Sequence, residues 1–192
     1  MLDAFSITAM QDERTLAWHG ADKEMKEEGL MALAVAQHRA NFDLWHEEDK
    51  ARDPGASDAE ITSVKHAIDR LNQQRNDLVE KMDGMLLTET GEQNAAAPLN
   101  SETPGLIIDR LSILALRIFH TREEAQRESA TEAHRQKNAA RLAVLEEQRS
   151  DLAGCLDALW AEVQARTRRF KLYRQMKMYN DPELNPVLYR HK

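Results

Sequence analysis

Apolar residues recur at intervals of three and four along most of this chain, which is the spacing of helices that bury one face. The pattern predicts helices over residues 7–19, 23–52 and 57–87, a fourth helix from residue 103, and a fifth apolar stripe from residue 142 to about residue 177. The chain holds 7 Gly and 5 Pro, and aromatic residues make up 5%, so residues typical of turns and strands are scarce. The sequence therefore predicts an all-α protein.

Several of these helices have clear start and stop signals. Asp53-Pro-Gly55 ends the second helix, because proline disfavours helix in the residue before it. Ser57-Asp-Ala-Glu60 has the spacing of a capping box at the start of the third. Thr103-Pro104 places an N-cap and a first-turn proline at the start of the fourth. Residues 88–102 between them contain glycine, proline and no periodic pattern, which predicts a loop.

The fourth helix is apolar on nearly every side over residues 106–119, so we expect it at the centre of a bundle. Residues 123–138 are charged and rich in alanine, which predicts a helix that is exposed or absent there. Residues 179–189 contain two prolines and should form an extended tail lying back over the bundle. We therefore expect one helical domain over residues 1–192, a bundle of about five helices with a central apolar helix and an extended C-terminal tail.

Composition narrows the class of protein. Hydrophobic residues make up 42% and charged residues 31% of 192 residues, a balance typical of soluble domains. No apolar run approaches the ~18 residues that span a bilayer, and residues 1–11 carry no secretory signal pattern. The single cysteine, Cys155, fits a reducing compartment and lies on the fifth apolar stripe. These features predict a cytoplasmic protein without a membrane span.

The charge is acidic overall but uneven. A net charge of −7 argues against binding nucleic acid or an anionic membrane. Lysines and arginines nevertheless crowd residues 166–177, on what the pattern predicts to be the end of the last helix. Cations near the C-terminal end of a helix stabilise it through the helix dipole, which is one explanation of the cluster. The other is that the basic helix binds an anion or a protein partner. The sequence leaves the formation of a homo-oligomer open.

Polar residues occur where a bundle is normally apolar. Arg75 projects into the middle of the buried face of the third helix, and a polar stripe runs beside it: Lys65, Asp69, Asn72, Asn76 and Asp83. Asn and Asp lower helix stability because they compete for backbone hydrogen bonds. Something should offset that cost. A buried hydrogen-bond network and a ligand or metal site are both consistent with the stripe.

The second and fourth helices contribute to the same region. One face of the second helix turns from apolar to polar and carries, with its margin, His38, Asn41, Trp45, Glu48, Asp49 and Arg52. The short turn after it should bring these residues near the third helix. Asp109 interrupts the apolar start of the fourth helix, and a buried carboxylate needs a partner, for which Arg75 or Lys65 is suitable. The candidate ligand site consists of residues from all three helices: His38, Asn41, Trp45, Glu48, Asp49, Arg52, Lys65, Asp69, Asn72, Arg75, Asn76 and Asp109.

Four segments resemble a family of bacterial proteins of unknown function. They are Asn41-Phe-Asp-Leu-Trp-His-Glu-Glu-Asp-Lys-Ala-Arg52, Ile68-Asp-Arg-Leu-Asn-Gln-Gln-Arg-Asn76, Thr103-Pro-Gly-Leu-Ile-Ile-Asp-Arg-Leu-Ser-Ile-Leu114 and Tyr179-Asn-Asp-Pro-Glu-Leu-Asn-Pro186. Members of this family are often encoded near glycosyltransferase and cell-surface polysaccharide genes. The resemblance implies a context of glycan biosynthesis and supplies no catalytic residue.

The first functional hypothesis is a binding protein for an anionic, sugar-linked or nucleotide-like small molecule. Trp45 offers a flat face to a sugar or a base. Asn41, Asn72 and Asn76 can hydrogen-bond hydroxyl groups, while Arg52 and Arg75 can pair with phosphate.

Two other classes remain open, a metal-dependent hydrolase and a structural or adaptor protein. Glu48, Asp49, Asp69 and Asp83 could hold Mg²⁺ for pyrophosphate hydrolysis. Residues Glu80-x-x-Asp83 match half of the motif of helical pyrophosphohydrolases, but Glu47-x-x-Lys50 departs from the other half. In an adaptor the polar stripes would only specify packing. Seven histidines and one cysteine show no paired zinc-ligand spacing, so the sequence predicts no zinc site.

Overall fold

The structure, a computed structural model, describes residues 2–20, 27–176 and 181–190. Its helices are α1 (Ala4–His19), α2 (Gly29–Lys50), α3 (Asp58–Thr90), α4 (Pro104–Gln126), α5 (Glu132–Gln164) and the short α6 (Pro186–Tyr189). The described residues contain one isolated β-bridge and no strand. The predicted all-α bundle with five main helices is therefore confirmed.

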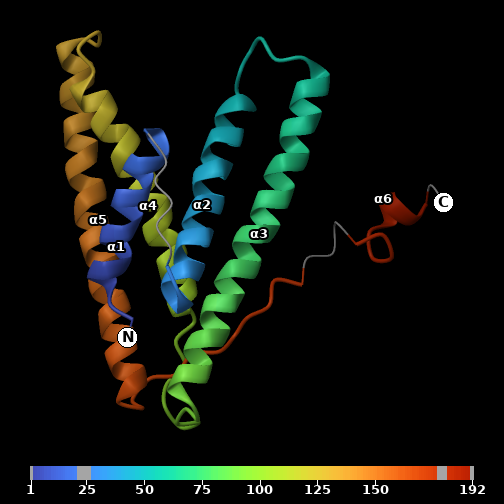
Figure 1. Ribbon diagram of the computed structural model, residues 1–192, viewed down its shortest axis with the longest axis vertical. Helices are drawn as coiled ribbons and strands as arrows, with labels where there is room; N and C mark the ends of the chain where they lie inside the picture. The colour runs from blue at the N-terminus through green and yellow to red at the C-terminus, as the bar shows by residue number, and fades with distance from the viewer. Residues whose placement is uncertain (1, 21–26, 177–180, 191–192) are drawn as a thin grey trace.

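The bundle consists of two antiparallel hairpins and one added helix (Figure 1). Helices α2 and α3 form one hairpin, α4 and α5 form the other, and α1 packs against α4, α2 and α5. Helix α4 contacts each of the other four long helices, which confirms its predicted central place. Its Ile108 and Leu111 are fully buried beside Met82 and Leu86 of α3. The two hairpins meet closely at one end and separate toward the other, as Figure 1 shows.

The helix starts follow the local signals in the sequence. Ser57 and Glu60 form the predicted capping box of α3, and Thr103 caps α4 by accepting a hydrogen bond from the backbone N–H of Leu106 at 3.2 Å. Helix α1 begins three residues earlier than predicted, because Asp3 caps it through the N–H of Ser6 at 2.8 Å. Helix α2 begins at Gly29, and the predicted residues 23–26 lie outside the described part of the chain.

The predicted end of the last long helix at about residue 177 is wrong, because α5 ends at Gln164. Arg166 adopts a left-handed conformation with φ 59°. The N–H of Arg166 then donates to the carbonyl of Val163 at 3.0 Å, and the N–H of Thr167 donates to that of Glu162 at 2.9 Å. This pair of bonds is the Schellman motif, which normally uses glycine at the left-handed position. Because Arg166 rather than glycine occupies this position, no local signal predicted the end of the helix.

The predicted basic C-terminal helix is consequently an extended segment. Its cations are partly engaged: Arg168 Nε donates to the carboxylate of Glu162 at 2.8 Å, and Arg169 Nε donates to the carbonyl of Ala97 at 2.8 Å. The segment pairs with the α3–α4 loop, where the N–H of Asn100 donates to the carbonyl of Arg169 at 2.7 Å. A basic helical face for a protein partner is therefore not formed by the described residues.

Three smaller features complete the fold. Residues 123–138 form the end of α4, a turn and the start of α5, and most of them are exposed. Residues 181–190 contain a turn and α6, with Leu184 and Val187 exposed by 50% and 67%, so this part of the tail is not covered by the bundle. Cys155 is exposed rather than buried. None of the described helices has the length and apolar character that a membrane span requires.

Candidate functional site

Asp109 of α4 is the centre of a buried polar network that joins α2, α3 and α4. Arg75 donates to it from Nε to Oδ1 at 2.7 Å and from Nη2 to Oδ2. Gln37 Nε2 and Asn41 Nδ2 donate to the same Oδ1 at 2.6 and 3.0 Å. The hydrogen bonds of Arg75 to Asp109 raise the pKa of Arg75, whose side chain is 25% exposed against 7% for Asp109. The predicted pairing of Asp109 with Arg75 is confirmed, and Lys65 is not its partner.

The network continues through His38 to α1. Asn41 Nδ2 also donates to Ser112 Oγ at 2.9 Å, and His38 Nδ1 lies 2.7 Å from the same hydroxyl. His38 Nε2 lies 2.9 Å from the carbonyl oxygen of Gln11 and 2.9 Å from Thr15 Oγ1. Because a carbonyl only accepts, Nε2 carries the hydrogen and Nδ1 accepts from Ser112. Burial lowers the pKa of His38 to about 3, so the ring stays neutral.

The network is almost fully satisfied. Its two exceptions are the side-chain oxygens of Gln11 and Gln37, which are buried and have no partner among the described residues. Gln11 Nε2 donates to the carbonyl of Ile108 at 3.2 Å, which links α1 directly to α4. Gln11 and Thr15 were missed by the sequence analysis. Both residues lie on the buried face of α1, four positions apart. Polar residues at helical spacing on an otherwise apolar face could have indicated that they belong to a buried network.

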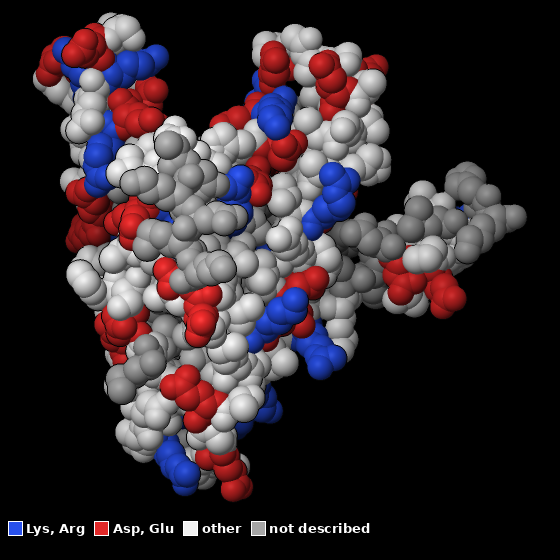
Figure 2. All heavy atoms as spheres, viewed as in Figure 1, with Lys and Arg blue, Asp and Glu red and all other residues white. Residues whose placement is uncertain are grey.

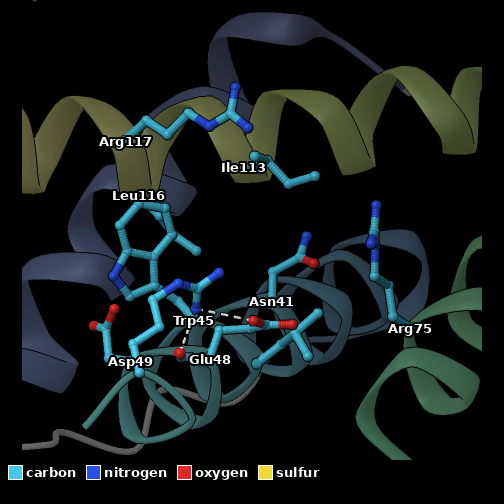
Figure 3. Close-up of a pocket in the computed structure, with 10 residues that line it drawn as sticks. Asn41, Trp45, Glu48, Asp49, Arg75, Ile113, Leu116 and Arg117 are labelled. Atoms are coloured by element: carbon cyan, nitrogen blue, oxygen red, sulfur yellow. Dashed lines mark hydrogen bonds and ion pairs between the residues drawn. The ribbon is translucent and has the colours of Figure 1, made fainter. Parts of the chain in front are cut away.

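A pocket of about 280 Å³ opens beside this network between α2, α3 and α4 (Figure 3). It lies where the two hairpins separate. Six lining residues belong to the predicted ligand site: Asn41, Trp45, Glu48, Asp49, Arg52 and Arg75. Four others were not predicted: Leu44, Ile113, Leu116 and Arg117. The structure therefore brings together the polar end of α2 and Arg75 of α3.

The pocket combines an aromatic ring with charges of both signs. Trp45 lies beneath Leu116 in Figure 3, and its indole stacks on the ring of His120 with centroids 4.9 Å apart and planes 12° apart. Arg52 pairs with Glu48 at 2.9 Å, while Arg75 pairs with Asp109. Arg117 is exposed and forms no ion pair with any residue that the structure describes. Arg117 therefore has a guanidinium available to an anion.

Other predicted residues lie away from the pocket. Lys65 and Asp69 form an exposed pair on α3 at 3.6 Å. Asn72 and Asn76 are half-buried, and neither makes a side-chain hydrogen bond with another described residue. They belong neither to the Asp109 network nor to the lining of the pocket.

Asp83 has a structural role at the start of α4. Its Oδ1 accepts a hydrogen bond from the N–H of Gly105 at 2.7 Å, and burial raises its pKa to about 6. Asp69 and Asp83 are separated along α3 by about 21 Å, given the rise of ~1.5 Å per residue. The four carboxylates considered for Mg²⁺, Glu48, Asp49, Asp69 and Asp83, therefore do not converge on one point.

The face of the molecule in Figure 2 has no continuous patch of one sign. Figure 2 shows Lys and Arg interspersed with Asp and Glu on the face it views, and a notch between the separated ends of the two hairpins. Mixed charge of this kind keeps a protein soluble without creating a long-range field of one sign. A local cation such as Arg117, rather than the overall field, would therefore select an anion.

Fold and site together define an all-α bundle with a buried polar network and an adjoining polar pocket. Residues 31–172 match the model of the family described as Protein of unknown function (DUF4254), and the chain belongs to this family. The match runs from the start of α2 past the end of α5, so it includes both hairpins and the pocket. No curated protein and no solved structure shows significant similarity to the chain.

Proposed function

We propose that this protein binds a small anionic molecule with a flat or sugar-like group in the pocket between α2, α3 and α4. The observation that carries the proposal is the meeting of Trp45 with Arg52, Arg75 and Arg117 in one concave site. An aromatic ring gives a large contact area at low entropic cost, and guanidinium groups pair with phosphate or carboxylate through two parallel hydrogen bonds.

The three arginines differ in how available they are. Arg117 forms no ion pair with a described residue, so binding an anion there breaks no contact. Arg52 would exchange its exposed pair with Glu48, which is worth at most about 1 kcal/mol. Arg75 lines the pocket, but its guanidinium already donates two hydrogen bonds to Asp109. Arg117 is therefore the expected main contact for a phosphate or carboxylate.

The size of the pocket limits the ligand. Its volume of about 280 Å³ lies near the lower end of the ~300–1,000 Å³ typical of small-molecule sites. It accommodates a sugar phosphate or one nucleobase-sized group. A sugar nucleotide would leave part of its length outside, in the notch between the hairpins (Figure 2).

The biological context belongs to the same proposal. The four segments resemble a family of bacterial proteins that are often encoded near polysaccharide genes, and this resemblance supports the proposal of a ligand from glycan biosynthesis. A cytoplasmic location is proposed from the single cysteine, Cys155, because sugar nucleotides and a reducing milieu occur together there.

A thermal-shift panel followed by calorimetry tests the binding proposal. The panel contains nucleoside mono- and diphosphates, sugar phosphates and sugar nucleotides, each with and without Mg²⁺. A ligand present at ~100 times its dissociation constant adds about 2.7 kcal/mol of stability, which raises the melting temperature by several degrees. We expect Arg117→Gln to weaken the best ligand about tenfold, the value of one charge-assisted hydrogen bond.

Arg110→Gln is the matched control. Arg110 lies on the same helix and is exposed, but its guanidinium pairs with Glu102 outside the pocket. This variant should bind as the wild type does. Equal affinity in Arg117→Gln and the wild type would move the ligand out of this pocket. A panel without any shift at millimolar concentration would contradict the proposal.

Two alternatives would then come forward. A structural or adaptor role is favoured by the nearly complete internal satisfaction of the Asp109 network. A Mg²⁺-dependent pyrophosphohydrolase has less support, because its four candidate ligands do not converge. Release of pyrophosphate or phosphate from a nucleotide with Mg²⁺ would revive it.

A further inference from the structure

Three histidines from three helices meet at the end of α1. His19 is the last residue of α1, His46 lies on α2 and His120 lies on α4. One ring nitrogen of each lies within 4.8 Å of the others, and this is the single group of three or more such donors that the described residues form. The three are far apart in sequence, so no spacing motif could have indicated the group.

The Nδ1 atom of each ring already forms a hydrogen bond. His19 Nδ1 lies 2.7 Å from the carbonyl oxygen of Thr15, and His46 Nδ1 lies 2.8 Å from that of Phe42. His120 Nδ1 lies 3.0 Å from the carboxylate of Glu123. Carbonyls and ionised carboxylates only accept, so each Nδ1 carries the hydrogen and each Nε2 keeps its lone pair. Metal-binding histidines are oriented by bonds of this kind.

The Nε2 atom of His120 is a second, independent indication. It is buried and has no hydrogen-bond partner among the described residues. A buried polar atom without a partner costs about 1–3 kcal/mol, so native structures rarely contain one without a reason. Coordination of a cation by this lone pair would remove the cost.

Aromatic packing alone does not account for the group. His19 stacks on Phe119 with centroids 4.3 Å apart, and His120 stacks on Trp45. These contacts explain the orientation of the two rings, but a phenylalanine at either position could stack in the same way. They do not explain three imidazoles whose Nδ1 atoms are all held by acceptors.

We propose that His19, His46 and His120 bind one divalent transition-metal ion of the Zn²⁺ type through their Nε2 atoms, with Glu123 as a positioning residue. Imidazole ligands suit Zn²⁺, Ni²⁺ and Cu²⁺, whereas Mg²⁺ prefers oxygen. Three protein ligands leave the fourth place of a tetrahedral ion to water or a ligand. The site does not depend on the proposed binding pocket, although the stack of His120 on Trp45 makes the two neighbours.

The geometry requires a small adjustment on binding. A tetrahedral ion with bonds of ~2.0–2.1 Å holds its ligand nitrogens about 3.3 Å apart. The rings must therefore approach one another by rotation. His19 is exposed at the end of α1 and has room to do so, while His46 and His120 are half-buried.

Calorimetry on the full chain, without a polyhistidine tag and after treatment with EDTA, tests this site. We expect one Zn²⁺ per chain with micromolar or tighter affinity, and no comparable heat with Mg²⁺. Co²⁺ should give the strong visible absorption of a four-coordinate ion. His19→Ala and His46→Ala should each weaken Zn²⁺ binding by about tenfold or more, and Glu123→Ala by about 10–100-fold.

His66→Ala is the matched control, because His66 is an exposed histidine on α3 outside the group. It should bind Zn²⁺ as the wild type does. Glu123 is 57% exposed, so its variant should fold normally and provides a result independent of the histidine substitutions. The absence of Zn²⁺ binding by the wild type, or wild-type affinity in His19→Ala, would overturn the proposal.

Discussion

At the scale of single residues, Asp109 shows how one carboxylate can fix the register of three helices. It accepts hydrogen bonds from Arg75, Gln37 and Asn41, which come from α3 and α2. A buried charge without partners is strongly disfavoured, so the helices are stable only in the arrangement that brings these donors to it. The sequence left Arg75 and Lys65 open as partners of Asp109, and the structure pairs Asp109 with Arg75, the cation in the middle of the apolar face.

Removing this carboxylate should be costly. Asp109→Ala leaves Arg75, Gln37 and Asn41 without their acceptor, and we expect the free energy of unfolding to fall by about 3 kcal/mol. Asp69→Ala, which removes the exposed pair with Lys65, should change it by less than about 1 kcal/mol. Urea unfolding of both variants measures the difference. Equal costs would mean that Asp109 is not the centre of the network.

His38 predicts a specific dependence of stability on pH. Its pKa is lowered by burial from 6.5 to about 3, so the unfolded chain binds more protons between these values and stability falls as the pH falls. From about pH 7 to about pH 5 this residue should remove about 2 kcal/mol. Asp83, whose pKa is raised to about 6, acts in the opposite direction.

The contribution of His38 is isolated by comparison with His38→Gln, which retains Asp83 and every other titrating group. The stability advantage of the wild type over this variant should shrink by about 2 kcal/mol between about pH 7 and about pH 5. Denaturant unfolding at both pH values measures it. A constant advantage would show that His38 titrates normally in the folded protein.

At the scale of elements, the close packing of α3 and α4 depends on Gly105. A Cβ atom at this position would lie 2.7 Å from Asp83 Oδ1 and 2.9 Å from the carbonyl oxygen of Val79. Both distances are too short for real contacts, so only glycine allows the first turn of α4 to approach α3. Asp83 can then cap that turn through the N–H of Gly105.

Two glycine substitutions should therefore have opposite signs. Gly105→Ala forces α3 and α4 apart and should destabilise the protein by about 1–3 kcal/mol. Gly154 lies in α5 with nothing within 4 Å of an added Cβ, so Gly154→Ala should stabilise by up to about 1 kcal/mol through helix propensity. Thermal unfolding distinguishes them. Stabilisation by Gly105→Ala would contradict the close approach.

The end of α5 depends on a residue in a strained conformation. Arg166 at φ 59° occupies a region that costs a side chain about 1–2 kcal/mol and costs glycine almost nothing. Arg166→Gly should therefore stabilise the protein by about 1 kcal/mol. Arg166→Ala removes the same charge but keeps the Cβ atom, so it should give no such gain. A gain of the same size in both variants would assign it to charge instead.

At the scale of the whole molecule, Phe170 closes the end of the bundle where the two hairpins meet. It is 1% exposed and belongs to the hydrophobic core, although it lies on the extended segment after α5. Gln93 from the α3–α4 loop brackets it: Gln93 Nε2 donates to its carbonyl, and its N–H donates to Gln93 Oε1, both at 3.0 Å. The extended segment is thus fixed to the α3–α4 loop by hydrogen bonds of its backbone and to the core by the ring of Phe170.

Loss of this anchor should affect the stability of the entire bundle. Phe170→Ala should lower the free energy of unfolding by about 3–5 kcal/mol. Phe5 is 80% exposed, so Phe5→Ala should change it by less than about 0.5 kcal/mol. Chemical denaturation followed by circular dichroism compares the two. A small effect of Phe170→Ala would mean that the extended segment is not part of the cooperative unit.

The sequence by itself determined the all-α class, the starts of α3 and α4, the central place of α4, and which buried faces carry polar residues. These features depend on periodicity and on caps that act within four residues, so they can be read locally. Tertiary structure decided which polar residues meet. It joined Asp109 to Arg75 rather than Lys65 and left Asn72 and Asn76 outside the network. It also ended α5 at Gln164, with Arg166 left-handed just beyond.

The difference between local signals and tertiary contacts also explains why the group of three histidines was not predicted. His19, His46 and His120 lie on three different helices, and each looks ordinary in its own segment. Their proximity results from the packing of α1 and α2 against α4, which depends on contacts between residues far apart in the chain. No local pattern records such contacts, so the three-dimensional arrangement alone could bring these ligands together.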